Sequence, residues 1–530
     1  MEYDGLVLMR TDLLLPINDC MMTRRRWPGD DYTREPDVST SCEPQISYLV
    51  RREKEEMKTL KALIVVLALL AVVVPVASAQ LGDCDRSSFS IQNLGTSAAT
   101  VTVYFYDEAG LESQPADLGG GQPNPFSLDP GAQYQVYVPG IPSLLDGRYS
   151  VVIESTEPVA VIANMIGYTG ACGAGNWPAF NGSYNGFDAG AGTYYMPSIV
   201  YAYSNWNSLI SIQNVNATTA DIDITIKDPR GNPDVVQSWT AVPAYASVHL
   251  DLEGSSIGLV AGLNGSAVVE SSLPVAVVDN QTAYGGGNGL TQTYNGFASG
   301  GAATKFFAPA LYNMFPAANG WRSSINVQNV GAATTNVTVS FSDGGVDMAC
   351  SNNPLDPGES CLLTMVSRAD GDTEFSGVIN SDSQPIVAIV NASNGNKKEA
   401  QTYSAIADGS GAETVSFPLV MKTFPGPTGG WDTNFLVQNI GAADCASLLV
   451  EYSDDVSTGA VGPSYTIAGP VAPGAYVSVY QPGDTNLPAN WYSGSVAVTC
   501  TGGLLGGIVN ETNHINNTSN GDWSMSYNGF

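Results

Sequence analysis

The sequence predicts an all-β protein made of four tandem antiparallel β-sandwich domains in an elongated array. Two observations support this prediction. Charged residues make up only 13% of the 530 residues, whereas Gly occurs 57 times and Pro 31 times, and such a composition favours short strands joined by many turns. In addition, three sequence blocks recur along the chain at intervals of roughly 110 residues, which is the size of one small sandwich domain.

The composition also limits the classes of function. Hydrophobic residues make up 44% of the chain, which is enough for each domain to bury a core. The formal net charge is −30, and a surface of this sign repels nucleic acid and anionic membranes. We therefore expect neither nucleic acid nor a membrane surface as a partner.

Residues 57–79 have the three parts of a secretory signal peptide. Two lysines precede an apolar run at residues 62–74, and an Ala-Ser-Ala cleavage site ends at Ala79. Because a signal peptide normally begins a protein, we interpret residues 1–56 as a non-native upstream extension and Met57 as the true start. The mature protein is then expected to be secreted, extracellular or on the cell surface, with no membrane contact after cleavage.

One strand recurs four times and ends in a Gln-Asn pair. In the third copy it has the sequence Ser-Ile-Asn-Val-Gln-Asn-Val-Gly, ending at Gly331. We expect the Asn to end the strand and shape the turn, because its side chain readily bonds nearby backbone groups. The four pairs are Gln92 and Asn93, Gln213 and Asn214, Gln328 and Asn329, and Gln438 and Asn439.

A tryptophan opens this strand in copies two to four. In copy three it shares its parity with Ile325 and Val327, and period-two patterning places such residues on one buried face. Copy one has Asp85 at this position. The pattern therefore predicts that the repeat cores contain Trp206, Trp321 and Trp431.

Two further blocks complete the repeat. The second, represented by residues 383–391, is an apolar run after a proline and predicts a central strand buried on both faces. It is degenerate in copy four. The third block, Tyr-Asn-Gly-Phe, closes copies one, two and four, and Tyr403-Ser-Ala-Ile406 replaces it in copy three. This block predicts an aromatic-flanked turn between repeats.

An extended segment with a proline opens copies two to four, at residues 195–200, 307–311 and 417–420. Proline within a strand indicates an edge strand. Copy one lacks such a lead, because only Gln80 to Asp83 lie between the cleavage site and Cys84. We expect either that copy one is a truncated cap or that another chain completes its edge.

The region after the signal peptide contains six cysteines. Each repeat that has any cysteine has two, which in an exported protein predicts disulfides within repeats rather than metal ligation. The predicted bridge in repeat 3 encloses a Leu-Asp-Pro-Gly turn. The pairs are Cys84 and Cys172, Cys350 and Cys361, and Cys445 and Cys500.

Catalytic residue sets are absent from the sequence. His249 and His514 are the only histidines; we expect His249 on a strand surface and His514 in a polar loop. No Ser-His-Asp, Cys-His or paired-His arrangement can be assembled. A glycosidase needs only two carboxylates, but the acids are scattered. We therefore predict no enzyme activity, no catalytic residues and no bound cofactor.

Two kinds of ligand remain as alternatives. Calcium could bind at repeat junctions through carboxylates such as Asp279, Asp370 or Asp372, although no specific calcium loop supports this. An aromatic cluster that includes Tyr201 and Tyr203 could stack on surface glycans.

The first half of each copy resembles the Ig-like adhesion modules of bacterial surface proteins. In copy three this half runs from the Gln-Asn-Val-Gly turn through Val337-Thr-Val-Ser-Phe341 to the Leu-Asp-Pro-Gly turn. The whole repeat is similar to arrays in secreted proteins of filamentous bacteria. This resemblance covers residues 80–530 and implies Ig-like sandwiches with an extracellular structural or adhesive role.

We therefore expect four Ig-like repeats, at residues 80–189, 190–299, 300–410 and 411–530. The predicted function is that of a structural subunit of an extracellular assembly, such as a filament, sheath or surface layer. End copies that differ from each other suit head-to-tail contacts, which propagate into a homopolymer. The alternative is a secreted adhesin or carbohydrate-binding repeat protein.

Overall fold

The computed structural model contains strands β1 to β33 and four short 3-10 helices, and no α-helix occurs in the part of the chain that it describes. Its strand ladders are antiparallel. The predicted all-β class is thus confirmed. The described residues are 84–168, 178–285, 288–316, 320–368, 371, 373–425, 430–455, 457–513 and 522–530.

The chain divides into two compact units, Met1–Pro75 and Val76–Phe530, and every described residue belongs to the second. The predicted upstream extension and signal peptide, residues 1–79, therefore lie outside the described residues. Within the described ranges, no helix is long and apolar enough to span a membrane.

The fourth repeat shows the arrangement most simply, because it consists of two four-stranded antiparallel sheets. Their strand orders are β30-β27-β32-β33 and β26-β31-β28-β29. We call the first the axial sheet and the second the outer sheet. The strands are β26 (Thr414–Met421), β27 (Trp431–Asn439), β28 (Cys445–Tyr452), β29 (Ser464–Val471), β30 (Tyr476–Tyr480), β31 (Ser493–Cys500), β32 (Leu505–Asn513) and β33 (Ser524–Asn528).

Repeat 3 has the same two strand orders, but its opening strand β17 also pairs with β18 and joins both sheets into one. The predicted central strand is β23, which lies between β18 and β24 and is buried along most of its length. The strands are β17 (Lys305–Phe315), β18 (Trp321–Asn329), β19 (Val337–Phe341), β20 (Met348–Ala349), β21 (Ser360–Thr364), β22 (Thr373–Ser381), β23 (Ile386–Asn394), β24 (Glu399–Ser404) and β25 (Ile406–Ala407).

Repeat 2 also has a single sheet, because the 23-residue strand β14 runs through both the outer and the axial parts. Its first half pairs with β9 and β11, and its second half pairs with β10 and β15. The strands are β9 (Ala191–Tyr201), β10 (Trp206–Asn214), β11 (Ala220–Lys227), β12 (Val235–Val242), β13 (Ser247–Asp251), β14 (Leu263–Gly285), β15 (Asn288–Asn295) and β16 (Phe297–Ala298).

Repeat 1 has the axial sheet β5-β1-β7-β8 and a smaller outer sheet in which β2 pairs with β3, β4 and β6. The proline-containing strands β9, β17 and β26, which we call the lead strands, have no counterpart among the described residues of repeat 1. The strands are β1 (Cys84–Asn93), β2 (Ala99–Tyr106), β3 (Glu112–Ser113), β4 (Phe126–Leu128), β5 (Gln133–Tyr137), β6 (Ser150–Ser155), β7 (Val159–Tyr168) and β8 (Pro178–Asn185).

The apolar cores of neighbouring repeats touch one another. Ile389 of repeat 3 packs in the core of repeat 2, and Ile508 of repeat 4 packs in the core of repeat 3. Ile162 of repeat 1 occupies the same position in its own strand and packs in the core of repeat 4. Each of the three side chains is fully buried. The first repeat therefore follows the fourth in the same way as the fourth follows the third.

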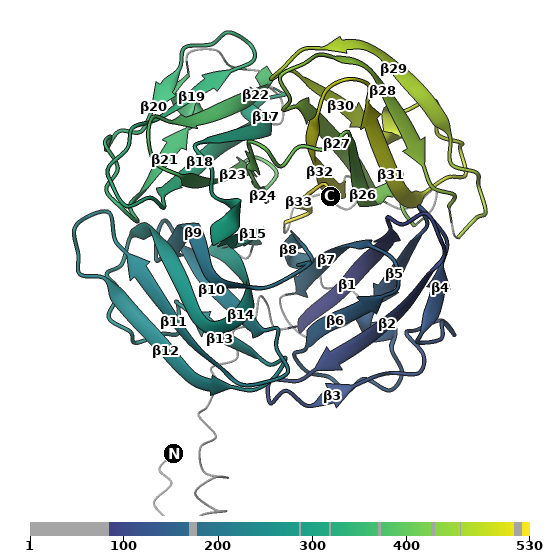
Figure 1. Cartoon of the computed structure of the whole chain (residues 1–530), viewed down its shortest axis with the longest axis horizontal. Coiled ribbons are helices and arrows are strands. Elements are labelled where there is room, and N and C mark those ends of the chain that lie inside the picture. The colour runs from purple at the N-terminus through teal and green to yellow at the C-terminus, as the bar shows by residue number, and fades with distance from the viewer. Residues whose placement is uncertain are drawn as a thin grey trace, which may run out of the picture. The chain divides into compact units, whose positions relative to one another are not determined.

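The repeats close on themselves, so the prediction of an elongated array is wrong. The last axial strands β8, β15, β24 and β33 contact one another in the cyclic order 1–2–3–4–1, and Figure 1 shows them gathered between the four repeats. The physical reason is burial: the central axial strands carry apolar residues on the face away from their own core. In a closed order, the preceding repeat covers that face, as the cores of repeats 2, 3 and 4 do for Ile389, Ile508 and Ile162.

Candidate functional site at the junctions between repeats

The structure pairs four of the six predicted cysteines. Cys350 and Cys361 form one disulfide, with Cα atoms 5.9 Å apart, and enclose the Leu-Asp-Pro-Gly turn of repeat 3 as predicted. Cys445 and Cys500 form a second disulfide between β28 and β31 of the outer sheet. The third predicted pair, Cys84 and Cys172, lies outside what can be described, since neither side chain is among the described ones.

The asparagine of each Gln-Asn pair is fully buried and organises the turn after the strand. In repeat 4, Asn439 Nδ2 donates to the carbonyls of Ala443 and Val471 at 2.8 Å each, and Asn439 Oδ1 accepts from the N–H of Gly441. Burying a side-chain amide is tolerable only because these bonds replace its bonds to water. The same set of bonds surrounds Asn93, Asn214 and Asn329.

The glutamines of the third and fourth pairs point toward the junctions with the preceding repeats. Gln438 Nε2 donates to Gly474 O at 2.9 Å within repeat 4 and lies 3.5 Å from Gly377 O of repeat 3. Gln328 Nε2 lies 3.4 Å from Ala267 O of repeat 2. Gln213 and Gln92 are the half-buried and buried counterparts in repeats 2 and 1. The motif thus combines a turn-forming residue with a junction residue.

The three tryptophans open equivalent strands but lie at the margins of the cores. Trp321 and Trp431 are half-buried and pack against the cores of repeats 3 and 4. Trp206 is also half-buried and forms an isolated bridge with Tyr203. The positions four and six residues later, Ile325 and Val327 in copy three, are fully buried, as the alternation predicts.

A serine hydroxyl crosses each of the four junctions in the same way. Ser495 Oγ of repeat 4 donates to Gly131 O of repeat 1 at 2.8 Å, which closes the order of repeats. The acceptor residues have positive φ between 58° and 83° at the same turn of each repeat. The other three bonds are Ser150 to Tyr245, Ser266 to Gly358 and Ser376 to Gly474, at 2.6, 2.7 and 2.7 Å.

A second chain of bonds runs through the centre and uses the Asn of the Tyr-Asn-Gly-Phe block. Asn295 donates to Asn185 O and accepts from Asn185 N–H. Asn185 makes the same two bonds with Asn528, and Asn528 makes them with Ser404. Each carboxamide imitates one rung of a β-ladder between repeats. The fourth link would start from residue 404, where serine is too short to make both bonds.

The predicted turn at this block is therefore wrong. Tyr-Asn closes strands β8, β15 and β33, and the following Gly bonds back to the central axial strand, as Gly296 N–H does to Val277 O. The tyrosine of the block anchors the repeat, also in copy three, where Ser404 replaces the Asn: Tyr403 Oη donates to Ala310 O and accepts from Ala310 N–H. The Asn-Gly pair suggested a hairpin turn, but here the strand ends where it contacts the equivalent strands of other repeats.

Two buried carboxyl groups sit at the closure of the order. Asp522 Oδ1 accepts from Ala400 N–H of repeat 3, and its Oδ2 accepts from Thr291 N–H of repeat 2. Glu511 accepts from Asn164 Nδ2 of repeat 1 at 3.2 Å. Burial raises the pKa of Asp522 well above its usual range and that of Glu511 to about 8. These carboxyls are thus poised to hold their protons near neutral pH.

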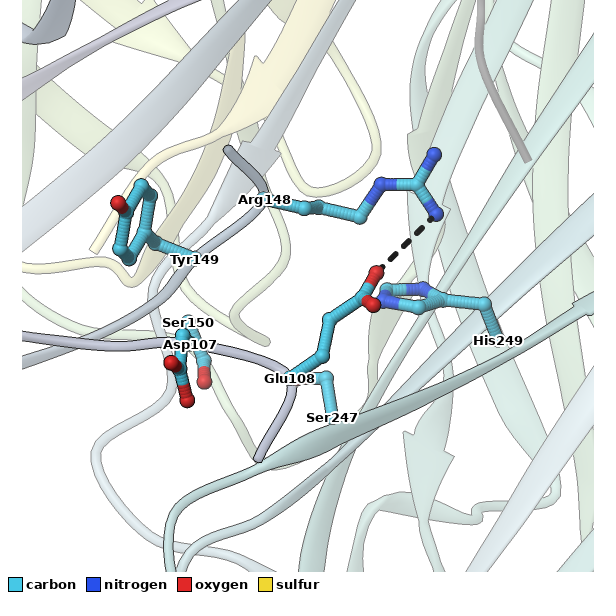
Figure 2. A pocket seen from close by; sticks show the side chains of 7 residues that line it. All are labelled: Asp107, Glu108, Arg148, Tyr149, Ser150, Ser247 and His249. Carbon is cyan, nitrogen blue, oxygen red and sulfur yellow. Dashed lines mark ion pairs between the residues drawn. The ribbon is translucent and has the colours of Figure 1, made fainter. Parts of the chain in front are cut away.

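A small cavity lies at the junction of repeats 1 and 2 and has a volume of about 20 Å³. Figure 2 shows Arg148 and Glu108 paired at 3.9 Å beside His249. His249, expected on the surface, is half-buried and shares a 2.9 Å hydrogen bond with Ser211 Oγ. Burial, and secondarily the charge of Arg148, lower the pKa of His249 to about 4. The cavity has room for about one water molecule, and its histidine is neutral at physiological pH.

The other predicted ligand residues are not brought together. Asp279 is fully buried in repeat 2, where its Oδ2 accepts from Ser208 Oγ and Gln281 Nε2. Asp370, Asp372 and His514 lie outside the described residues. Among the residues that the structure describes, no three acids, histidines or cysteines lie close enough together to hold a metal ion.

The aromatic cluster of repeat 2 divides between core and surface. Tyr194 is only 1% exposed and lies in the core, whereas Tyr201, Tyr203 and Trp206 are half-buried around one turn. Glycan binding by Tyr201 and Tyr203 therefore stays a prediction. The sequence missed the junction serines and the ladder role of the central asparagines. Both kinds of residue recur at the same place in successive copies. This recurrence could have identified the positions as important, but it could not have identified their hydrogen-bond partners.

Fold and site together define a closed set of β-sandwich repeats held by repeated junctions. No protein-family model matches the chain, and no curated protein matches it. Among solved structures, it is similar to Thermotoga maritima 1070, with 22% identity over 21% of this chain and 96% of that chain and a TM-score of 0.19. It is also similar to the serine-rich repeat protein Srr2 from Streptococcus agalactiae, with 10% identity over 48% of this chain and 84% of that chain and a TM-score of 0.11.

Proposed function

We propose that the chain is a structural subunit of an extracellular assembly, built from four Ig-like repeats and stabilised by disulfides. The observation that supports this best is that many buried polar side chains form hydrogen bonds between repeats. The junction serines, the central asparagines and Asp522 all bond one repeat to another. A unit whose polar interior is devoted to internal closure is suited to bearing shape rather than to turning over a substrate. We therefore propose no catalytic role.

Closure changes how such an assembly would be built. Repeats 1 and 4 pack against each other within one chain. Their contact surfaces are therefore not available to join one subunit to the next, and head-to-tail contact of the end copies cannot build a polymer. Subunits would instead meet through their outer surfaces. Large apolar side chains are exposed at the same outer hairpin in three repeats, and repeat 2 has none in its version of that hairpin. They are Leu111 at 71%, Val346 at 88% and Val461 at 70% exposure.

These three side chains supply a recurring contact for neighbouring subunits. The proposal includes secretion, for which the two disulfides are favourable because such bonds persist in oxidising compartments. It also includes calcium as a condition to vary, since acidic outer surfaces on adjacent subunits repel each other unless a cation lies between them.

Electron microscopy and sedimentation velocity of the purified protein, with and without calcium, test the proposal. We expect ordered polymers or sheets, and we expect the triple substitution of Leu111, Val346 and Val461 to Ser to reduce them to single subunits. Val236→Ser, which removes a 58% exposed valine from an outer strand, is the matched control and should leave assembly intact. Single subunits under every condition would overturn the proposal.

A further inference from the structure

The outer sheets of repeats 1 and 4 end differently. In repeat 4, lead strand β26 pairs with β31, and lead strands β9 and β17 pair likewise with β14 and β22. The counterpart of β31 in repeat 1 is β6, which pairs with β2 on one side. On its other side, no strand of the described chain pairs with it. A free strand edge of this kind exposes a row of backbone donors and acceptors.

The burial of a side chain on β6 also shows that no described strand covers its far side. Ile153 lies opposite Val103 of β2, just as Ile379 lies opposite Val339 and Val498 lies opposite Val450. Ile379 and Val498 are fully buried, whereas Ile153 is half-exposed. The strand pairing on the near side is the same, so the difference lies on the far side, where no described strand covers Ile153.

A tyrosine hydroxyl provides a second, independent sign. Tyr294, Tyr403 and Tyr527 each donate from Oη to a lead-strand carbonyl, at the residue after the lead proline. Tyr184 is their counterpart in repeat 1 and is half-buried. Its hydroxyl has no hydrogen-bond partner among the described residues. Strand edge and tyrosine hydroxyl thus mark the two ends of one place that no described residue of repeat 1 fills.

We propose that this place in repeat 1 accepts an extended strand from another polypeptide, by strand addition to the free edge of β6. The inference rests on the proposed function in one respect, that the donor belongs to a neighbouring component of the assembly. The lead strands define the donor's chemistry. The residue facing the Ile153 position is large and apolar, and proline follows three residues later: Tyr194 and Pro197, Phe306 and Pro309, and Val415 and Pro418.

The protein's own lead strands cannot serve as donors, because each is already paired within its repeat. In a chain that begins at Gln80, four residues precede Cys84, whereas the lead strands are 8 to 11 residues long. A donor in trans is therefore required for that chain. The upstream residues 72–76, Val-Val-Val-Pro-Val, also have the lead pattern, and a chain that retains them provides the rival occupant.

The test uses the protein starting at Gln80 and a fluorescent peptide with the sequence of residues 305–313, Lys-Phe-Phe-Ala-Pro-Ala-Leu-Tyr-Asn. We expect saturable binding by fluorescence anisotropy and new hydrogen-exchange protection along β6. The Tyr184→Phe variant should bind about two- to tenfold more weakly, the range expected for one hydrogen bond. Tyr294→Phe removes the same hydroxyl where the lead strand is present and should bind normally. A peptide with Asp in place of Phe306 should not bind.

Three results would overturn the inference. The first is the absence of saturable binding by the peptide. The second is an equal effect of Tyr184→Phe and Tyr294→Phe. The third is a chain starting at Met57 that keeps residues 57–79, excludes the peptide and already has β6 protected, which would make the occupant residues 72–76 of the same chain.

Peptide binding and assembly are scored separately, so the two proposals can fail independently. Single subunits that bind the peptide would contradict the structural role and leave the strand-accepting edge standing. Polymers that form while the peptide never binds would do the reverse.

Discussion

Repeats 1 and 3 place an isoleucine at the same position of the same strand, yet only one of the two is buried. Ile153 and Ile379 face valines of the neighbouring strand in identical register. Ile379 is sealed by lead strand β17, and Ile153 has no such cover among the described residues. Burial at this position therefore depends on a strand contributed from another part of the sequence. A pattern that is local in sequence can specify the face of a strand without specifying what covers it.

The largest effect is expected when each of the two isoleucines is replaced by alanine. Ile379→Ala should lower the free energy of unfolding by about 2–5 kcal/mol, because it leaves a cavity in a closed core. Ile153→Ala should cost about 1 kcal/mol, because part of that side chain is already in water. Urea unfolding of both variants measures the difference. Equal losses would show that the lead strand does not determine burial here.

Removal of a tyrosine hydroxyl sharpens the comparison at a single pair of atoms. Tyr403→Phe deletes two hydrogen bonds to Ala310 and leaves its buried backbone groups without partners. We expect a loss of about 1–3 kcal/mol in unfolding free energy. Tyr184→Phe should change stability little, since its hydroxyl has no hydrogen-bond partner among the described residues. Thermal or urea unfolding decides this, and a comparable loss in Tyr184→Phe would contradict it.

The other side of repeat 1, where it meets repeat 4, should respond to pH. Burial raises the pKa of Glu511 from 4.5 to about 8, so the folded state keeps a proton that the unfolded chain releases. The stability contributed in this way is complete below about pH 4.5 and is lost as the pH rises toward 8. Glu511→Gln should flatten that decline, measured by urea unfolding at a series of pH values.

The control for this measurement is Glu154→Gln, which changes an exposed carboxyl of β6 and should keep the wild-type pH dependence. A Glu511→Gln variant with an undiminished decline in stability between pH 4.5 and 8 would refute the assignment.

The smallest expected effect is a gain, at the junction between repeats 2 and 3. Ser404→Asn would let residue 404 bond the backbone of Asn295, as Asn528 bonds that of Ser404. Two new hydrogen bonds between half-buried residues should add about 1 kcal/mol to the unfolding free energy. Ser404→Asp is the control, since it can accept from the N–H but cannot donate to the carbonyl. No gain with Asn would mean that the chain of asparagines does not stabilise the centre.

Much of the local structure could be predicted from the sequence. The alternation around Gln438 and Asn439 gave the strand, its buried face and the turn, because period-two patterning and Asn chemistry act over a few residues. The cysteine counts predicted both described disulfides, because repeats 3 and 4 each contain only two cysteines, which can pair only with each other inside the repeat. Trp321 packs against its core but is only half-buried, since parity indicates the face of a strand and not the depth of a side chain along it.

The closed cyclic order of the four repeats could not be predicted from such local patterns. Ser495 and Gly131 are 364 positions apart, and nothing in either segment names the other as its partner. The repeated serines showed that a position mattered, but the identity of the acceptor depends on how four folded units fit together. The same holds for Asp522, whose acceptor role requires Thr291 and Ala400 from two other repeats.

The bond between Ser495 and Gly131 also has a consequence for how the molecule forms. Three junctions join repeats that are adjacent in the chain, so each can be made as soon as the later repeat has folded. The fourth joins the first and the last repeats, and it can be completed only after almost the entire chain is available. Contacts of such long sequence separation form slowly. Until then the apolar axial face of repeat 1 is exposed to solvent, and any factor that covers it while the chain folds would raise the yield of folded protein.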